Sequence, residues 1–219
     1  MAQFPFEGFP ALSAIGICRH VFTQRIPGID VSNDKPEVLK RLDSAHREIR
    51  KAVGMGDWPL VTAQQIHGNK IAVVDKPLKT DQEFPGCDGI ITNQRGVVLG
   101  VYVADCCAVY IIDSKTQAIG LVHSGRKGTE LGAVTNAIAE MVQQFGSKPV
   151  DLIVQLSPCI RPPHYEVDFA PKIMEQCRDQ GAREIHDSGV CTACDLEHYY
   201  SYRAEKGRTG RMLALLGLK

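Results

Sequence analysis

The sequence lacks both a long apolar run and an excess of either charge. None of its apolar stretches approaches the roughly 18 residues that a membrane-spanning helix needs. Its 25 basic residues are balanced by 25 acidic ones, so it has no broad basic field for nucleic acid or for an anionic membrane. We therefore expect neither a nucleic acid nor a membrane as a partner.

An export signal, internal repeats and low-complexity tracts are also missing. The first ten residues have neither the basic start nor the long apolar core of a signal peptide. Eight cysteines without such a signal favour reduced thiols in the cytoplasm over a disulfide framework. A length of 219 residues with 44% hydrophobic residues suits one soluble domain with a well-filled core. We predict a single domain over residues 1–219, with 1–13 as an irregular lead-in.

The most informative stretch runs from Val97 to Thr129. Three short runs rich in Val, Ile and Tyr are separated by polar or Gly-rich steps, a pattern typical of buried strands. Asp105 and Cys106 follow the first run, and His123 follows the third. Side chains at strand ends are held rigidly and can face a cleft. We predict that Cys106 and His123 meet there and that His67 joins them from upstream.

Apolar periodicity predicts the remaining elements. Gly68-Asn69 is a plausible hairpin turn between two of the strands, and prolines favour a rigid loop at 157–163. His46 lies beside the apolar stripe of the first helix, where we predict a structural or surface role. Strands outnumber helices and do not alternate with them regularly, which favours an α+β fold with a mixed sheet over a doubly wound fold. Predicted helices span 36–53, 130–145 and 169–179, predicted strands span 14–22, 60–66, 71–74, 90–92, 151–156 and 212–216, and a polar loop spans 76–86.

His67, Cys106 and His123 are candidate zinc ligands. Two imidazoles and one thiolate suit zinc, and a three-ligand site leaves the fourth position open for water or substrate. The same residues also fit a site without metal. There Cys106 would be a nucleophile and His123 its base, oriented by Asp105 or His67. A neighbouring imidazolium would lower the pKa of the thiol.

A second motif is a weaker candidate for a zinc site. His164-Tyr165-Glu166 matches the H-x-E half of the zinc nucleobase deaminases, and Cys191 and Cys194 could supply the other half. Val190 stands where that signature requires proline. The C-x-x-C pair has no thioredoxin-like βαβ context. We therefore predict that these two cysteines pack beside the aromatic residues of the tail.

Several basic residues flank Gly-containing turns and could bind phosphate or carboxylate. Arginine presents several donors in a geometry that matches these groups. Arg203 and Arg211 are the preferred candidates because they lie beside Tyr-Ser-Tyr and Thr-Gly segments. The full set is Arg126, Lys127, Arg203, Arg208 and Arg211.

Taken in order, the motifs of the chain resemble the YfiH/laccase-domain family, often labelled polyphenol oxidase or multicopper oxidoreductase. The resemblance covers roughly residues 14–216. The ordered set is far more specific than any one of its members. The motifs are Gln64-Gln65-Ile66-His67-Gly68-Asn69, Asp88-Gly89, Ala104-Asp105-Cys106, Val122-His123-Ser124-Gly125, Tyr165-Glu166-Val167, Cys191-Thr192-x-Cys194, Tyr200-Ser201-Tyr202-Arg203 and Thr209-Gly210-Arg211.

The resemblance implies an α+β fold with mixed sheets flanked by helices, and a zinc site whose ligands carry over to His67, Cys106 and His123. It implies phosphorolysis of adenosine, inosine, guanosine and methylthioadenosine, with adenosine deamination at the same site. Some members instead remove a wrong amino acid from a muramyl nucleotide. Zinc is favoured over copper because a multicopper cluster requires many histidines, and this chain has seven in all.

The turn after His123 departs from the family pattern. The family usually has His-Ala-Gly-Trp-Arg-Gly, whereas this chain has Ser124-Gly125-Arg126-Lys127-Gly128 after the histidine. The aromatic residue is absent, and lysine replaces arginine. The segments after Arg25 and between 169 and 191 are also shorter than usual in the family.

Our leading hypothesis is a zinc-dependent purine nucleoside phosphorylase with adenosine deaminase side activity. In it, Lys127, Arg203 or Arg211 holds the attacking phosphate. One alternative is a Cys–His hydrolase that cleaves an amide in a muramyl nucleotide precursor through Cys106. Another is a non-catalytic descendant that binds nucleotides, suggested by the altered turn.

Overall fold

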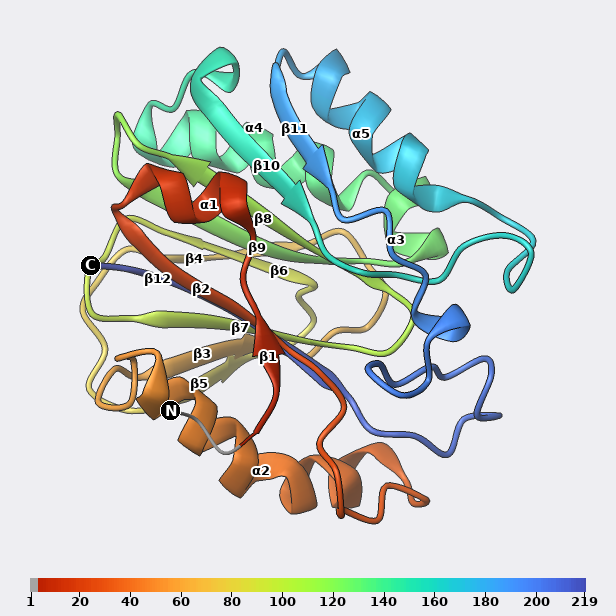
Figure 1. The fold of residues 1–219 in the computed structure, drawn as a ribbon. Helices are drawn as coiled ribbons and strands as arrows, with labels where there is room; N and C mark the ends of the chain where they lie inside the picture. Colours follow the sequence, from red (N-terminus) through yellow and green to blue (C-terminus); the bar gives the residue numbers. More distant parts are fainter. Residues whose placement is uncertain (1–3) are drawn as a thin grey trace.

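Two six-stranded mixed sheets form the centre of the computed structural model, which describes residues 4–219 (Figure 1). Sheet A has the order β1 (Phe6–Glu7), β2 (Cys18–Thr23), β12 (Met212–Leu218), β7 (Val98–Val103), β3 (Leu60–Ala63) and β5 (Gln82–Phe84). Sheet B has the order β11 (Glu184–Asp187), β10 (Leu152–Leu156), β8 (Cys107–Asp113), β9 (Ala118–Ser124), β6 (Gly89–Thr92) and β4 (Ile71–Val74). Each sheet combines parallel and antiparallel pairs, which confirms the predicted α+β class with mixed sheets.

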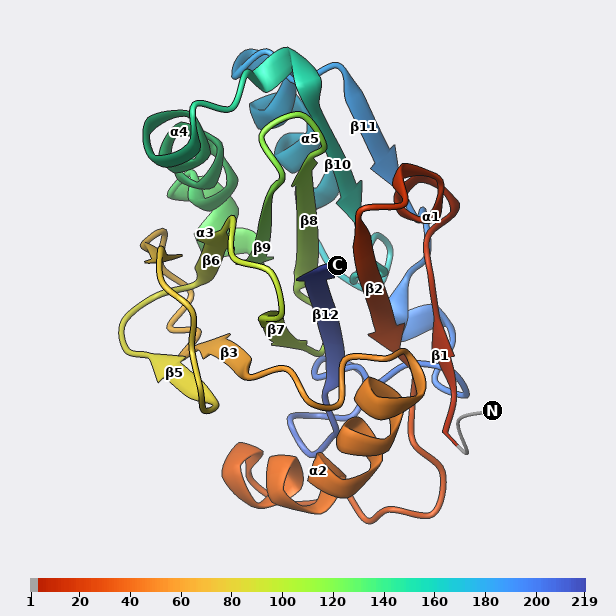
Figure 2. The same ribbon diagram turned by 90° about the vertical axis from the view of Figure 1, so that its left-hand side faces the viewer.

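The helices cover the outer faces of the two sheets. Figures 1 and 2 show α2 (Lys35–Ala52) below sheet A, and α4 (Ala133–Phe145) and α5 (Phe169–Asp179) on the far side of sheet B. The helix α1 (Pro10–Ile15) lies against β2, and the short helix α3 (Arg126–Glu130) follows β9. The chain therefore forms one domain of four layers. None of the helices in residues 4–219 is long and apolar enough to span a membrane.

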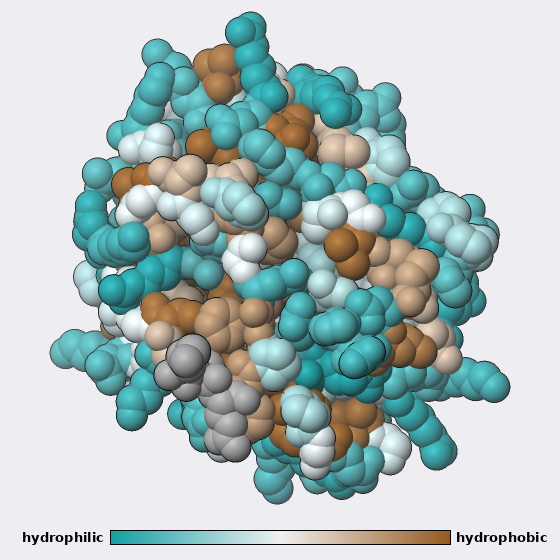
Figure 3. Space-filling model, viewed as in Figure 1, coloured by the Kyte–Doolittle hydropathy of each residue, from teal (hydrophilic) through white to brown (hydrophobic). Residues whose placement is uncertain are grey.

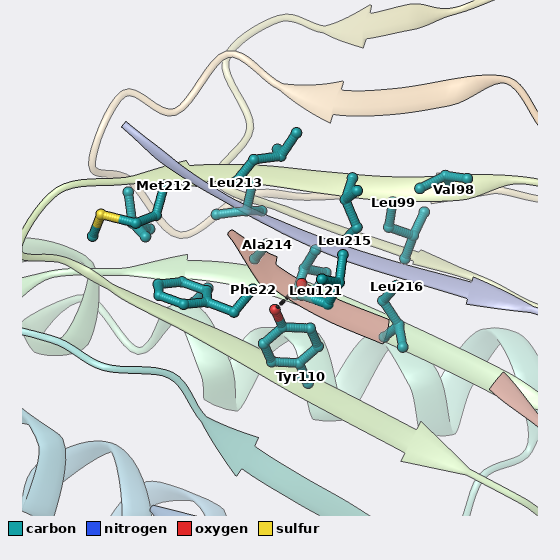
Figure 4. Packing of buried hydrophobic residues seen from close by; sticks show 14 of the residues in the cluster. Phe22, Val98, Leu99, Tyr110, Leu121, Met212, Leu213, Ala214, Leu215 and Leu216 are labelled. Carbon is teal, nitrogen blue, oxygen red and sulfur yellow. Dashed lines mark hydrogen bonds between the residues drawn. The ribbon is translucent and has the colours of Figure 1, made fainter. Parts of the chain in front are cut away.

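The main core lies between the two sheets (Figure 4). Every residue of β12 is buried, as expected for a continuous apolar run that packs on both faces. Tyr110 of sheet B is fully buried, and its hydroxyl donates a hydrogen bond of 2.8 Å to the carbonyl of Val21 in sheet A. The space-filling view shows a mostly polar exterior with scattered apolar side chains (Figure 3).

Local sequence signals predicted several elements well. The predicted helix at 36–53 corresponds to α2, whose N-cap Asp34 accepts a hydrogen bond from the backbone N–H of Glu37. The predicted helix at 169–179 has the bounds of α5, and β7, β8 and β9 are the three strands expected after Val97. In each case the apolar pattern and the end signals agree with the tertiary packing.

Other predictions were wrong. The hairpin expected at 60–74 does not form, since β3 pairs in parallel with β5 and β7 while β4 pairs in parallel with β6 of the other sheet. Gln65 and His67 adopt left-handed backbone conformations (φ 62° and 60°), and the chain passes there from one sheet to the other. The loop at 76–86 contains β5, and the edge strand β11 was not predicted because its half-exposed residues lack a clear apolar pattern.

Some element boundaries also differ from the prediction. The strand predicted at 60–66 ends at Ala63. The lead-in is not irregular throughout, because Pro10 starts α1 and Gly16 (φ 77°) ends it, so the following strand begins at Cys18 rather than at Ala14. Residues 1–3 of the lead-in lie outside the described part. The helix predicted at 130–145 is divided, because Gly132 takes a left-handed conformation (φ 75°) between α3 and α4.

His46 is buried on α2, with neither ring nitrogen hydrogen-bonded, 5.9 Å from the ring of Tyr102. Burial lowers the pKa of His46 to about 4, although the charge of Asp43 opposes the shift. A folded-state pKa below the unfolded value of about 6.5 means that the unfolded chain binds the proton first as the pH falls. The stability that depends on a neutral His46 is therefore lost as the pH falls below about 6.5.

We expect the free energy of unfolding to fall by roughly 2 kcal/mol between pH 7 and pH 5 because of His46. Urea unfolding of the wild type and of His46→Leu at both pH values measures this difference. The variant should lose less stability over that interval. Equal losses in the two proteins would show that His46 does not titrate as an isolated buried imidazole.

Candidate metal centre

The structure brings His67, Cys106 and His123 together where the two sheets meet. His67 follows β3 of sheet A, Cys106 links β7 of sheet A to β8 of sheet B, and His123 lies near the end of β9. Their nitrogen and sulfur ligand atoms all lie within 4.8 Å of one another. In residues 4–219 no other group of three His, Cys, Asp or Glu side chains meets this geometry. Two imidazoles and a thiolate this close suit a tetrahedral ion with one open position.

Asp88, which directly precedes β6, positions two of these residues. Its carboxylate is fully buried and accepts hydrogen bonds from the backbone N–H groups of Ile66, His67 and Gly68, at 3.2, 2.8 and 2.7 Å. It also lies 2.9 Å from Nδ1 of His123. With Nδ1 donating to Asp88, Nε2 of His123 is left as the ligand atom, an arrangement common in zinc sites.

The pKa of Asp88 reflects these contacts. Burial alone would raise the pKa of Asp88, but the hydrogen bonds from His123 and from the backbone of Gly68 and His67 lower it overall. The carboxylate therefore stays ionised and holds the left-handed turn at His67 against its conformational cost. The sequence motif Asp88-Gly89 marked this residue, but nothing in the spacing revealed what it contacts.

Asp105 does not orient His123, contrary to one of our sequence-based alternatives. Its carboxylate accepts hydrogen bonds from the Thr192 hydroxyl at 2.8 Å and from the backbone N–H of Arg203 at 2.6 Å. Asp105 itself is buried, and its backbone adopts a left-handed conformation (φ 83°). It thus fixes the backbone next to Cys106 and ties the C-terminal loops to the site, while Asp88 contacts the imidazole.

Cys106 and His123 favour their charged forms in this arrangement. Burial opposes a thiolate at Cys106, but the charge of His123 and hydrogen bonds from both histidines outweigh it and lower the pKa of Cys106 to about 6. Burial likewise opposes the imidazolium, yet Cys106 and Asp88 raise the pKa of His123 to about 9. The thiolate is the form in which cysteine binds metal or attacks a substrate.

A pocket of about 900 Å³ opens over the three residues. Its lining includes the apolar and aromatic side chains of Ile160, Tyr165 and Phe169, and those of Tyr102 and Tyr202. Basic residues outnumber acidic ones, which are Asp105 and Glu130. The basic lining residues are Lys35, Arg126, Lys127, Arg203, Lys206 and Arg211. The pocket therefore suits a small molecule that combines a ring system with negative charge.

A family model described as multi-copper polyphenol oxidoreductase laccase matches residues 15–182 and 168–219 of the sequence. The chain belongs to this laccase family. A relative from Corynebacterium glutamicum, named purine nucleoside phosphorylase, is 28% identical over 91% of this chain and 94% of the relative. The purine nucleoside phosphorylase YlmD of Bacillus subtilis is 27% identical over 93% of this chain and 85% of the relative.

Solved structures show that the family fold is shared. YlmD from Geobacillus stearothermophilus superposes with a TM-score of 0.85 at 22% identity, covering 99% of this chain and 100% of that chain. The hypothetical protein YfiH of Bacillus licheniformis gives a TM-score of 0.78 at 21% identity over 92% of this chain and 93% of that chain. The laccase-family fold predicted from the ordered motifs is confirmed.

The basic residues predicted from this laccase-family sequence do not all reach the pocket. Lys127, Arg203 and Arg211 line it, whereas Arg208 does not. Lys35 was not singled out from the sequence, because it lies at the start of α2 and far along the chain from the other lining residues.

The second motif does not form a metal site in this laccase-family chain. Glu166 lies 2.9 Å from Nη2 of Arg203 and 3.6 Å from Nη1 of Arg126, both at the rim of the pocket. Cys191 donates weakly to the carbonyl of Arg161 at 3.9 Å, and Cys194 is exposed. In the deaminase-like pattern, Glu166 therefore pairs with arginines at the rim of the pocket, and Cys191 contacts the carbonyl of a loop residue.

Gly125 gives a direct test of how tightly the laccase-family site is packed. A Cβ at this position would overlap Sγ of Cys106, and any larger residue must displace the thiolate. We expect Gly125→Ala to reduce metal affinity by about 10–100-fold, as changes to residues that position a metal ligand do. Competition with a chromogenic chelator measures it.

Gly8→Ala is the matched control, because its Cβ would meet only His20 at 3.4 Å. It should bind metal as the wild type does. Wild-type affinity in Gly125→Ala would contradict the close packing of Gly125 on Cys106.

Proposed function

We propose that the chain is a zinc-dependent purine nucleoside phosphorylase that acts on adenosine, inosine, guanosine and methylthioadenosine, with adenosine deamination at the same site. One observation carries the proposal. A three-ligand His-Cys-His group lies in a pocket lined by basic and aromatic residues. Relatives over most of the chain that carry the name purine nucleoside phosphorylase support it.

Zinc is the ion that we propose for His67, Cys106 and His123. A His₂Cys set also occurs in blue-copper sites, but those add a weak axial ligand, commonly methionine. The lining of this pocket, within residues 4–219, contains no methionine. A bound zinc ion would act as a Lewis acid and lower the pKa of a water molecule at its open position.

Phosphorolysis needs a phosphate held in line with the glycosidic bond. An oxygen of HPO₄²⁻ forms a bond to C1′ of the ribose as the C1′–N9 bond breaks, and the bonding electrons leave with the purine. The proton of the phosphate ends on a purine nitrogen, so the products are the free base and ribose 1-phosphate. At least one of Lys127, Arg203 and Arg211 supplies positive charge that holds the phosphate. Tyr165 and Phe169 offer ring faces for the purine.

The first test is chromatography of each nucleoside incubated with the purified protein of known zinc content. We expect inosine to yield hypoxanthine only when phosphate is present. Adenosine should yield adenine with phosphate, and inosine plus ammonia without it, because water replaces the amino group at C6. Intact nucleosides at full zinc occupancy would refute the proposal.

A Cys–His hydrolase that acts on an amide of a muramyl nucleotide is the second candidate. The proximity of Cys106 to two imidazoles is the observation that favours it. In that reaction Cys106 Sγ bonds to the amide carbon, and the amine leaves with a proton from His123. Water then releases the acid. Activity that survives a chelator, together with a trapped Cys106 adduct, would favour this candidate over the phosphorylase.

A further inference from the structure

The basic residues of the pocket fall into two groups. Arg126 pairs with Glu130 at 3.0 Å and with Glu166 at 3.6 Å, while Arg203 pairs with Glu166 at 2.9 Å. Their charges are thus partly neutralised at the rim. Lys35, Lys127, Lys206 and Arg211 form no ion pair with any residue of the described range 4–219. Of these four, Lys127 and Lys206 are exposed to solvent, whereas Lys35 and Arg211 are half-buried. Positive charge therefore remains available at Lys35 and Arg211.

Lys35 and Arg211 both line the pocket from elements of the sheet A side, since Lys35 begins α2 and Arg211 directly precedes β12. Burial is the main cause that lowers the pKa of Lys35, and the charge of Arg211 adds to it, offset in part by Glu83 and Asp88. Burial also lowers the pKa of Arg211. Two half-buried cations without a paired carboxylate are unfavourable unless an anion lies between them.

The guanidinium of Arg211 is held in place. Its Nη1 donates hydrogen bonds to the carbonyls of Thr209 at 2.9 Å and Gly210 at 2.8 Å, and its Cζ lies 5.6 Å from the centre of the Tyr202 ring. The remaining guanidinium nitrogen atoms keep their donors for a ligand. Such a fixed group loses little conformational freedom when it binds a phosphate.

The two ends of the pocket lie on opposite sheets. Lys35 starts α2, which covers sheet A, whereas Phe169 starts α5, which covers sheet B (Figures 1 and 2). The His67–Cys106–His123 group lies where the sheets meet. Arg203 belongs to the aromatic end, because its Cζ lies 4.9 Å from the centre of the Tyr165 ring.

We propose that Lys35 and Arg211 together form the subsite for inorganic phosphate, and that the end lined by Tyr165, Phe169 and Arg203 receives the purine. The inference rests on the proposed phosphorylase function and adds Lys35 as a residue that determines the co-substrate. Placing the two subsites at opposite ends of the pocket agrees with phosphorolysis, since phosphate must approach C1′ from the side opposite to the departing base.

Lys35→Met tests the subsite. Lys35→Arg is the conservative variant, and Lys40→Met is the control. Lys40 is an exposed lysine on the same helix and does not line the pocket, so Lys40→Met removes the same charge elsewhere. Loss of a charge-assisted contact should raise the KM for phosphate about tenfold or more in Lys35→Met. The KM for inosine should change less than about twofold, and Lys35→Arg should recover most of the phosphate affinity. Lys40→Met should match the wild type.

Calorimetric titration of inorganic phosphate into each zinc-loaded protein, without nucleoside, separates this inference from the proposed function. Weaker phosphate binding in Lys35→Met alone would support the subsite even if no nucleoside were cleaved. Active wild-type protein with unchanged phosphate KM and unchanged phosphate binding in Lys35→Met would overturn the subsite and leave the phosphorylase in place.

Discussion

Cys106→Ala is expected to lose both its bound zinc and all detectable phosphorolysis. The substitution removes the only thiolate of the ligand group and leaves two imidazoles, which bind zinc far more weakly than three protein ligands do. Metal content by elemental analysis should fall from about one zinc per chain to near zero. Phosphate-dependent loss of inosine should disappear in the same preparation.

Cys107→Ala is the matched control for this variant. Cys107 is adjacent in sequence but fully buried in β8, where its Sγ contacts the carbonyl of Ser157 at 3.8 Å and does not line the pocket. Its replacement should lower stability through lost packing and retain both zinc and activity. A Cys106→Ala protein that kept its zinc and its turnover would remove Cys106 from the site.

Asp88→Asn is expected to have the second largest effect, because one carboxylate supports two candidate ligands. The amide cannot accept from all three backbone N–H groups at 66–68 and from His123 as a carboxylate does. We expect zinc affinity to fall by about 10–100-fold. We also expect the free energy of unfolding to fall by about 3 kcal/mol, as for loss of several charge-assisted hydrogen bonds. Chelator competition and urea unfolding measure the two effects.

Asp113→Asn separates metal positioning from general stability. Asp113 is also fully buried and accepts hydrogen bonds from the backbone N–H groups of Lys115 and Thr116 at 2.9 and 3.2 Å, but it is the last residue of β8, next to the turn that leads to β9. Its variant should lose stability and keep the wild-type zinc affinity. Equal zinc affinities in Asp88→Asn and the wild type would show that Asp88 does not position the ligands.

The three candidate ligands could be predicted from the sequence because each follows or ends a short apolar run. Val98–Val103 and Ala118–Ser124 are continuous apolar strands with polar residues at their ends, and neighbouring strand ends lie at one edge of the core. The order of the motifs then indicated the family. Local patterns therefore contained enough information for the site centre and for most helices.

The residues around that centre depend on contacts that local patterns do not encode. β3 and β4 follow one another in sequence, yet they pair in different sheets through strands that come later in the chain. Asp88 reaches His123 across 35 positions, and Lys35 reaches the pocket only because α2 crosses sheet A. Non-local pairing of this kind is decided by tertiary packing rather than by propensity.

Phosphorus NMR of inosine and inorganic phosphate incubated with the zinc-loaded wild type tests the central claim most directly. A phosphorylase converts inorganic phosphate into a sugar 1-phosphate, in step with the hypoxanthine released. We predict that this new resonance forms with the wild type and is absent with Cys106→Ala. Hypoxanthine without the sugar phosphate would indicate hydrolysis, and unchanged phosphate and inosine at full zinc occupancy would contradict the proposed function.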